Sequence, residues 1–382
     1  MRVLIAPDKF KGSLSAPEVA EAMARGVSRV AEGAQVDRVP MADGGEGTVD
    51  ALVAATGGSY HRARVTGPLG DPVDAVFGLL GDEKTAVLEM SSASGLTLVP
   101  TTRRDPWRAS TRGTGELILA ALRAGARRII MGIGGSATND GGAGLAQALG
   151  FRLLDAEGRE LGPGGGELGR LARIDSTAKV DVLNSVEIAV ACDVTNPLCG
   201  PHGASAVYGP QKGASPEMVQ RLDENLAHWA TIIERDLGVA IRDLPGAGAA
   251  GGLGAGLVAF VGGRLEKGVN LVLDTVKLRD RLAGAHLCFT GEGAIDSQSA
   301  YGKTAVGVAS LARSLGCPAI ALVGSIGPGA EAVLDAGVTA YFSICPGPIS
   351  LEDAMARASE LIENATAQAL RIFLAGRARA DS

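Results

Sequence analysis

The sequence predicts an α/β protein, with a Rossmann-like parallel-sheet domain formed by both chain ends and an inserted second α/β domain with a mixed sheet. Three observations support this class. Apolar runs alternate with helical patterns at the start of the chain and again from His286. Residues from about 61 to 100 instead alternate apolar and polar side chains, as antiparallel strands do. The 382 residues also exceed what one core usually supports. We place the first domain at 1–65 and 288–382, the inserted domain at 66–287, and the active site in the cleft between them.

The first domain should begin with a strand at Val3 to Ala6, because a parallel strand covered on both faces is continuously apolar. The sequence Ser15-Ala-Pro-Glu18 then provides an N-cap, an early proline and an acidic third residue, which predicts a helix to about residue 31. A strand over 35–40 and a helix over 47–56 complete a βαβα unit.

The inserted domain should start with antiparallel strands, since turn sequences interrupt the alternating region at Gly67-Pro68, Asp71-Pro72 and Gly81-Asp82. The pattern after it predicts helices at 113–125 and 215–236 and strands at 128–131, 151–154 and 186–191. From His286 the alternation of apolar runs and helical patterns returns. It predicts strands at 286–290, 319–323 and 340–344 and helices at 302–315, 329–336 and 351–375.

Composition excludes several classes of protein. The net charge is −6, only 3% of the residues are aromatic and no basic face is apparent, which argues against nucleic-acid binding. The five cysteines have no metal-binding spacing. The first apolar run is too short for a signal peptide, and the uncharged run 246–263 is too rich in Gly and Ala for a membrane span. We expect a cytoplasmic protein that does not bind membranes, with the oligomeric state, a homodimer included, left open.

Acidic residues follow three of the predicted parallel strands. Ligands of open parallel sheets bind beyond the carboxyl ends of the strands, so these residues should converge. Any one of them alone would be explained as a capping or solvated carboxylate, but the set favours a functional site. Its members are Asp8 with Lys11, Asp43 with Glu46, and Glu292 with Asp296. Converging carboxylates favour Mg²⁺, and Lys11 and Lys303 would neutralise a transferring phosphate.

The stretch from Thr290 to Thr304 should be a phosphate-binding turn between a strand and a helix. It ends in Gly-Lys-Thr, as a P-loop does, but the P-loop spacing requires Gly where this chain has Ser297. We therefore predict phosphate chemistry that does not use a P-loop.

A second class of function rests on Gly132-x-Gly134-x-x-Ala137, which follows a predicted strand, with Asp155 ending the next one. This spacing is similar to a dinucleotide fingerprint and predicts a nicotinamide-dependent oxidoreductase. Against it, two glycines would fall in the crossover helix at a cost of about 1 kcal/mol each. We interpret 132–144 as a longer loop, in which Ser136, Thr138 and Asn139 bind phosphate or a substrate carboxylate, with a purely structural turn as the alternative.

The strand at 186–191 is followed by Asp193 and Asn196, and a later turn carries Lys212. An Asp beside an Asn at a strand end suits metal ligation or deprotonation of an alcohol, although an Asx-turn also accounts for it. A metabolite sensor that binds without turnover is a third class of function.

Six motifs then occur in order along nearly the whole chain. They are Asp8-Lys-Phe-Lys-Gly-Ser-Leu-Ser15, Ala42-Asp-Gly-Gly-Glu-Gly-Thr48, Gly134-Gly-Ser-Ala-Thr-Asn-Asp-Gly-Gly-Ala-Gly144, Cys192-Asp-Val-Thr-Asn-Pro197, Gly209-Pro-Gln-Lys-Gly213 and Thr290-Gly-Glu-Gly-Ala-Ile-Asp296. Together they resemble the type I glycerate kinase family, in which Ser often stands at the position of Lys9.

This resemblance implies ATP- and Mg²⁺-dependent transfer of the γ-phosphoryl group to D-glycerate, giving 2-phosphoglycerate in preference to 3-phosphoglycerate. Asp193 or Asp296 would be the base, with Asp8 and Lys11 also catalytic, and Asp8, Asp43 and Glu292 would hold Mg²⁺ or orient the attack. The predicted substrate- and phosphate-binding residues are Asp43, Glu46, Ser136, Thr138, Asn139, Asp140, Asn196, Lys212, Glu292 and Lys303.

Overall fold

The computed structural model describes residues 1–301 and 303–380, and its architecture confirms the predicted α/β class. The chain forms two compact units. Unit 1 comprises Met1–Asp43, Asp50–Gly57 and Val269–Ser382, and unit 2 comprises Gly44–Val49 and Gly58–Gly268.

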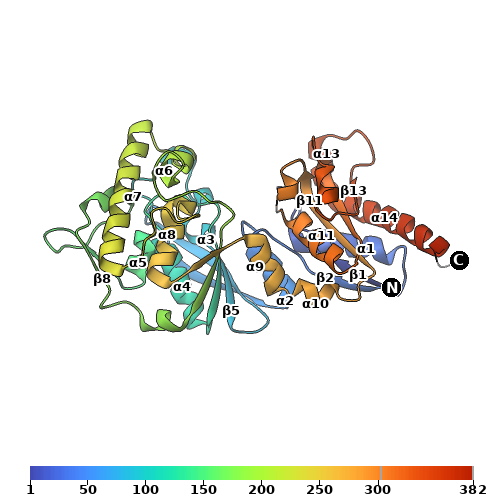
Figure 1. Cartoon of the computed structure of the whole chain (residues 1–382), viewed down its shortest axis with the longest axis horizontal. Coiled ribbons are helices and arrows are strands. Elements are labelled where there is room, and N and C mark those ends of the chain that lie inside the picture. Colours follow the sequence, from blue (N-terminus) through green and yellow to red (C-terminus); the bar gives the residue numbers. More distant parts are fainter. Residues whose placement is uncertain (302, 381–382) are drawn as a thin grey trace. The chain divides into compact units, whose positions relative to one another are not determined.

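Unit 1 contains a five-stranded sheet in the order β13-β12-β11-β1-β2, in which every pairing is parallel. The first strand lies between β2 and β11, so both ends of the chain build one sheet, as predicted (Figure 1). The strands are β1 (Arg2–Ile5), β2 (Gln35–Arg38), β11 (Leu287–Ile295), β12 (Ala319–Ile326) and β13 (Ala340–Ser343).

The helices of unit 1 include α1 (Ala16–Ser28), which begins at the predicted cap, where the Glu18 carboxylate accepts hydrogen bonds from the Ser15 amide at 2.8 Å and its hydroxyl at 2.7 Å. A Cβ at Gly26 would lie 2.5 Å from the Glu363 carbonyl oxygen, so glycine lets α1 approach α14 (Ala358–Ala380) closely. The other helices are α2 (Thr48–Thr56), α9 (Gly268–Thr275), α10 (Leu278–Leu282), α11 (Thr304–Ser314), α12 (Ala332–Asp335) and α13 (Leu351–Ala356).

Unit 2 contains a six-stranded mixed sheet in the order β10-β9-β6-β5-β4-β3. The β3–β4 and β4–β5 pairs are antiparallel and the others are parallel, which confirms the mixed sheet. Its strands are β3 (Ser59–Thr66), β4 (Pro72–Leu79), β5 (Thr85–Glu89), β6 (Arg128–Gly132), β9 (Glu187–Ala191) and β10 (Arg264–Glu266), while β7 (Arg152–Leu154) and β8 (Arg173–Asp175) form a separate antiparallel pair.

The helices of unit 2 are α3 (Ser91–Ser94), α4 (Arg112–Arg123), α5 (Ala143–Ala148), α6 (Ala204–Tyr208), α7 (Pro216–Leu237) and α8 (Ala249–Val261). Short 3-10 turns lie at Leu96–Leu98, Thr101–Arg103, Gly165–Arg170, Asp181–Ser185 and Pro210–Lys212, and in unit 1 at Ser299–Tyr301.

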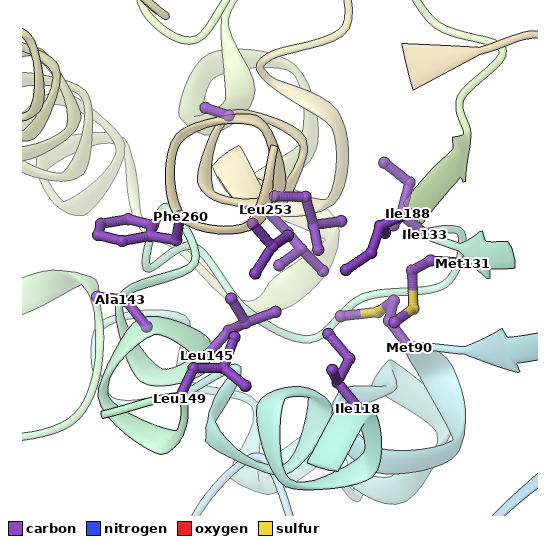
Figure 2. Packing of buried hydrophobic residues seen from close by; sticks show 14 of the residues in the cluster. Met90, Ile118, Met131, Ile133, Ala143, Leu145, Leu149, Ile188, Leu253 and Phe260 are labelled. Carbon is purple, nitrogen blue, oxygen red and sulfur yellow. The ribbon is translucent and has the colours of Figure 1, made fainter. Parts of the chain in front are cut away.

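The core of unit 2 joins its sheet to α4, α5 and α8 (Figure 2). Met131 from β6, Ile118 from α4 and Leu253 from α8 have no exposed surface and belong to one cluster of buried residues. Burying a side chain of this size contributes about 1.5–3 kcal/mol. The packed sheet and helices therefore give the loops at its edge a rigid base.

Two predicted elements differ from the observed ones. Strand β11 continues to Ile295, because backbone pairing with β12 up to Ile326 outweighs the polar sequence that predicted a turn from Thr290. The strand predicted at 151–154 forms as β7, which pairs with β8 in a separate sheet. The predicted helix at 351–375 is divided into α13 and α14, and the predicted helix start at 302 lies outside the described residues.

The compact units also differ in extent from the predicted domains. Strand β3 pairs within the sheet of unit 2, and unit 1 already begins again at Val269. The domain assignment with its active-site cleft remains a prediction. No helix among residues 1–301 and 303–380 is long and apolar enough to cross a membrane.

Candidate active site

Unit 1 brings together most of the acidic residues that the strand-end argument selected. Asp8 follows β1, Asp43 lies beyond β2, and Glu292 lies within β11. The Lys303 Nζ lies 3.7 Å from Glu292 Oε2 and 3.9 Å from Asp296 Oδ1. The charges of Asp8, Asp296 and Asp43 all act on Glu292, so these carboxylates form one electrostatic cluster, called the carboxylate cluster below.

Asp8 is the most firmly held member of the carboxylate cluster. Its side chain is buried, and Oδ2 accepts a hydrogen bond of 2.6 Å from Thr304 Oγ1 at the start of α11. Burial raises the pKa of Asp8, the nearby Asp43 charge raises it further, and the bonds from Thr304 and Lys9 oppose the rise. The backbone amide of Asp8 donates to the Gly291 carbonyl oxygen at 2.8 Å, which ties the loop after β1 to β11.

Glu292 is the member whose protonation is most sensitive to its surroundings. Burial raises its pKa to about 7, Lys303 opposes this, and the other three carboxylates add to it. Its Oε1 atom is buried and has no hydrogen-bond partner among the described residues. A buried carboxylate oxygen without a partner is unusual, and it can accept a donor or a cation from a ligand.

Asp296 has a different environment, because 42% of its side chain is exposed. Its Oδ1 accepts hydrogen bonds from the backbone amides of Gln298 at 2.9 Å and Ser299 at 3.1 Å. Desolvation acts to raise its pKa, but Lys303 and these bonds outweigh it, so the pKa lies below the usual value. Asp296 is therefore an ionised carboxylate that also shapes the turn after β11.

Two further predicted residues, Lys11 and Glu46, are exposed. Lys11 is exposed, and its side chain makes no hydrogen bond or ion pair with the part of the chain that the structure describes. Glu46 is exposed and belongs to unit 2. No group of three or more His, Cys, Asp or Glu side chains in 1–301 and 303–380 is arranged as a metal site.

Unit 2 holds the second set of predicted residues in the loop after β6. The side chain of Lys212 is buried, and its Nζ donates hydrogen bonds of 2.6 Å to both Ser136 Oγ and the Thr138 carbonyl oxygen. Burial lowers the pKa of Lys212 to about 7, and the Asp140 charge opposes this. Lys212 therefore fixes the conformation of the 136–138 segment from inside the unit.

Asp140 anchors the other end of this loop. It has no exposed surface, and Oδ2 accepts hydrogen bonds from the Thr111 amide at 2.8 Å, the Thr111 hydroxyl at 2.9 Å and the Gly144 amide at 3.2 Å. Burial raises its pKa, and the bonds from Thr111 and the nearby amides oppose the rise. The loop is thus tied to the residue that precedes α4.

Two side-chain oxygens between these anchors remain unpaired. Asn139 Nδ2 donates to Ser205 Oγ at 2.9 Å, but Asn139 Oδ1 and Thr138 Oγ1 are buried without a hydrogen-bond partner among the described residues. The loop rests on backbone: a Cβ at Gly251 would lie 2.0 Å from the Thr138 carbonyl oxygen, and Gly251 has φ +70°. Only glycine accommodates this contact in this backbone conformation.

Asp193 and Asn196 lie in the loop after β9. Asp193 is exposed, and its Oδ1 accepts a hydrogen bond from the Gly268 amide at 2.9 Å. Asn196 Nδ2 donates to the His202 carbonyl oxygen at 2.8 Å, and its Oδ1 accepts from the Tyr208 hydroxyl at 2.7 Å. Both groups of the Asn196 amide therefore already hold the loop together.

The oxidoreductase alternative is not supported. Its fingerprint requires Asp155 at the end of a strand beside β6, but β7 pairs with β8 in a separate sheet. Asp155 Oδ2 lies 3.0 Å from a guanidinium nitrogen of both Arg159 and Arg170, so the carboxylate already forms ion pairs with these two arginines. Strand β6 ends at Gly132 and the next helix begins only at Ala143, so a loop spans 133–142 within the 132–144 stretch that we interpreted as a loop.

Three contact residues were missed by sequence reasoning. Thr304 bonds Asp8, Thr111 bonds Asp140 and Ser205 bonds Asn139. The Gly-Lys-Thr sequence could have indicated Thr304, since its hydroxyl follows the phosphate-facing lysine. Nothing in the sequence around Thr111 or Ser205 distinguishes them from ordinary helix-start residues.

Comparison with known proteins bears on what these two sets of residues do. The family model described as "Glycerate kinase family" matches residues 3–374. The chain belongs to the glycerate kinase family. A glycerate kinase of Bacillus subtilis (strain 168) is 54% identical over 363 residues, 95% of each chain. The glycerate 2-kinase of Escherichia coli (strain K12) is 51% identical over 354 residues, 93% of each chain.

A crystal structure supports this membership at the level of the fold. It is that of a protein from Salmonella typhimurium LT2 with the provisional name glycerate kinase 2, and it superposes with a TM-score of 0.91 at 49% identity, covering 99% of each chain. This member of the glycerate kinase family is therefore a kinase, an enzyme of the transferase class.

Proposed function

We propose that this chain transfers the γ-phosphoryl group of ATP to the 2-hydroxyl of D-glycerate, giving 2-phosphoglycerate, with the 3-hydroxyl as the less favoured acceptor. The carboxylate cluster of unit 1 is the observation that carries the chemistry, since it places buried acids and a lysine at the carboxyl ends of parallel strands. The names of the relatives from Bacillus subtilis and Escherichia coli support glycerate as the acceptor, and the second supports the 2-position.

The residues present fit a Mg²⁺ ion. Glu292 Oε1 is buried without a hydrogen-bond partner among the described residues. Burial raises the pKa of this carboxyl and the neighbouring carboxylates add to the rise, so a divalent cation would offset both the desolvation and the repulsion. Mg²⁺ needs only one or two carboxylates when water and phosphate oxygens complete its shell, so Glu292 together with Asp8 or Asp43 would suffice to hold it. When bound, the ion would neutralise charge on the phosphate oxygens.

The protein's part in phosphoryl transfer is positioning and charge compensation. Lys303, shared between Glu292 and Asp296, would be drawn toward an entering phosphate, and the exposed Lys11 can follow it. Asp193 or Asp296 would accept the hydrogen bond of the glycerate hydroxyl. Because the transition state of phosphoryl transfer is loose, the base mainly orients this hydroxyl.

Unit 2 would supply substrate contacts through the loop after β6. Lys212 and Asp140 hold this loop from within, which leaves Thr138 Oγ1 and Asn139 Oδ1 as polar atoms with unused bonding capacity. Ser136, Asn196 and Lys212, which we predicted as direct ligands, would then act by shaping the loops. Glu46 and Asp43 remain proposed contacts.

The decisive experiment incubates purified protein with ATP, Mg²⁺ and D-glycerate and follows products by ³¹P and ¹³C NMR. We expect ADP and 2-phosphoglycerate in equal amounts. ADP release that does not depend on D-glycerate would contradict the proposal, and 3-phosphoglycerate as the main product would contradict the assigned position alone. Omitting Mg²⁺ should abolish turnover. The cytoplasmic location and a homodimer remain predictions.

A further inference from the structure

Unit 1 contains a groove of 480 Å³ between β13 and α14 that no predicted site residue lines. Buried Ile344 and Leu361 form part of its apolar lining, while Phe342 of β13 and Ile372 of α14 have 38% and 65% of their surfaces exposed. Small-molecule sites typically occupy about 300–1,000 Å³ and have mostly apolar walls. The groove therefore has the size and the lining of such a site.

Strand pairing places this groove next to the carboxylate cluster, within the same unit. Ser343 of β13 lines the groove and pairs with Val323 of β12, which in turn pairs with Glu292 of β11. Neighbouring strands lie about 4.8 Å apart, so the backbones of Ser343 and Glu292 are separated by about 10 Å. A ribose with a triphosphate chain can span this distance.

A ligand that reaches from the groove to Glu292 crosses the edge of the sheet. Phe289 of β11 belongs to the same core cluster as Leu361 of α14, and side chains alternate along a strand, so Glu292 faces the side of the sheet opposite α14. Strand β13 ends at Ser343, and Pro346 beyond it still lines the groove. The groove thus extends past the carboxyl end of β13, and open parallel sheets bind ligands beyond these ends.

The polar side chains of the groove lie in order along α14, beginning at the same edge. The Ser13 hydroxyl, in the loop after β1, donates to the Met355 carbonyl oxygen at 2.9 Å, so the chain just before α14 lies at the carboxyl ends of the strands. Four polar residues that line the groove then follow at intervals of three or four, which places them along one side of the helix. They are Arg357, Glu360, Asn364 and Gln368.

The two amides at the far end of this row have unused hydrogen-bonding groups. Asn364 Oδ1 accepts a hydrogen bond of 2.8 Å from Arg29 Nη1, so the Asn364 Nδ2 group points away from Arg29. The side chain of Gln368 is exposed and has no hydrogen-bond partner among residues 1–301 and 303–380. A Gln amide pairs with the N6/N7 edge of adenine, and an exposed aromatic ring such as that of Phe342 stacks on a base.

The two charged residues lie nearer the carboxyl edge and pair with each other. Glu360 accepts two hydrogen bonds from Arg357, at 3.0 and 3.2 Å, and its oxygens retain lone pairs. In nucleotide sites of open parallel sheets an acidic residue accepts the hydroxyls of the ribose, and arginine suits phosphate. From the edge inward, the groove therefore presents groups for phosphate, ribose and base in the order in which a nucleotide carries them.

We propose that this groove binds the adenosine part of ATP, with the Phe342 ring stacked on adenine and the Gln368 amide paired with its N6/N7 edge. Glu360 accepts a ribose hydroxyl, and the phosphates cross the end of β13 toward Glu292 and Lys303. The inference rests on the proposed function, in which ATP is the phosphoryl donor. It assigns base recognition to unit 1, the unit that holds the carboxylate cluster.

The test measures ADP binding by titration calorimetry with Mg²⁺ present, and steady-state kinetics with ATP and D-glycerate. Phe342→Leu, which keeps the apolar bulk but removes the ring, and Gln368→Ala should each weaken ADP binding and raise the KM for ATP by at least about fivefold. The KM for D-glycerate and kcat should change by less than about twofold. Phe342→Tyr retains the ring, and Gln35→Ala removes an exposed amide at the start of β2, so both should match wild type.

Unchanged ADP affinity in Phe342→Leu and Gln368→Ala would overturn the inference, and so would a wild type that does not bind ADP. Loss of a dimer in Phe342→Leu by analytical ultracentrifugation, with unchanged ADP affinity, would assign the groove to a second copy of the chain. The binding data also separate the two proposals. Weaker ADP binding by the variants supports the groove even if wild type forms no 2-phosphoglycerate. Turnover by wild type with unaltered ADP binding by the variants leaves the kinase proposal standing and removes the groove.

Discussion

Thr304 Oγ1 donates a hydrogen bond of 2.6 Å to Asp8 Oδ2, which joins the first residue of α11 to the loop after β1, 296 residues away in the sequence. The bond opposes the pKa rise that burial imposes on Asp8. It therefore helps to keep a buried carboxylate ionised at the centre of the carboxylate cluster.

Thr304→Val should lower both kcat/KM and the stability of the folded protein at neutral pH. Without the hydroxyl the pKa of Asp8 rises further, so the acid limb of the kcat/KM profile should move to higher pH, and unfolding should become easier by about 1–3 kcal/mol. The checks are a pH–rate profile and urea denaturation. Thr304→Ser keeps the hydroxyl and should behave nearly as wild type, and an unmoved acid limb in Thr304→Val would show that this bond does not tune Asp8.

Glu292 should make the ligand-free protein less stable as pH rises. Its pKa is raised from 4.5 to about 7, so between these values the folded state holds a proton that the unfolded state releases. The free energy of unfolding should fall across this window by about 3 kcal/mol. Glu292→Gln should match wild type at pH 5 and exceed it at pH 8 in urea denaturation without Mg²⁺ or nucleotide.

The exposed Glu331→Gln provides the control for this pH dependence, and it should follow wild type at both values. Equal loss of stability in wild type and Glu292→Gln would assign the effect to other groups. The same substitution should lower turnover, because an amide cannot replace the buried carboxylate oxygen toward a cation.

Gly251→Ala should destabilise unit 2 more than the backbone conformation alone explains. Gly251 and Gly238 have φ of +70° and +71°, but a Cβ at Gly251 would lie 2.0 Å from the Thr138 carbonyl oxygen, while Gly238 has open space. We expect about 1–2 kcal/mol for Gly238→Ala from left-handed strain, and at least twice that for Gly251→Ala. Similar urea midpoints for the two variants would contradict the close contact.

Asp193→Asn and Asp296→Asn should separate the two proposed bases. The true base should lose kcat by roughly a hundredfold with little change in the KM for ATP. The low pKa of Asp296 and its bonds to the turn after β11 suit a carboxylate that orients the hydroxyl. Wild-type kcat in both variants would mean that neither residue accepts the proton.

The convergence of the carboxylate cluster could be predicted because it depends on short segments of the sequence. Asp8 and Asp43 each follow a short strand, and parallel strands end at one edge, so the sequence order implies convergence. The same reasoning could not give Glu292 its position inside β11, because that extension depends on pairing with β12. It also could not predict that Asp140 and Lys212 are buried and hydrogen-bonded, since their partners are distant in sequence.

By itself, the sequence determined the α/β class, the formation of one parallel sheet by both chain ends, and the family, because strand periodicity, caps and ordered motifs are properties of short segments. Only the tertiary structure decided which polar groups are buried and already paired. The desolvation of Glu292 and the unpaired oxygens of Thr138 and Asn139 depend on atoms brought together from distant parts of the chain. Burial sets the cost of leaving such a polar group unpaired.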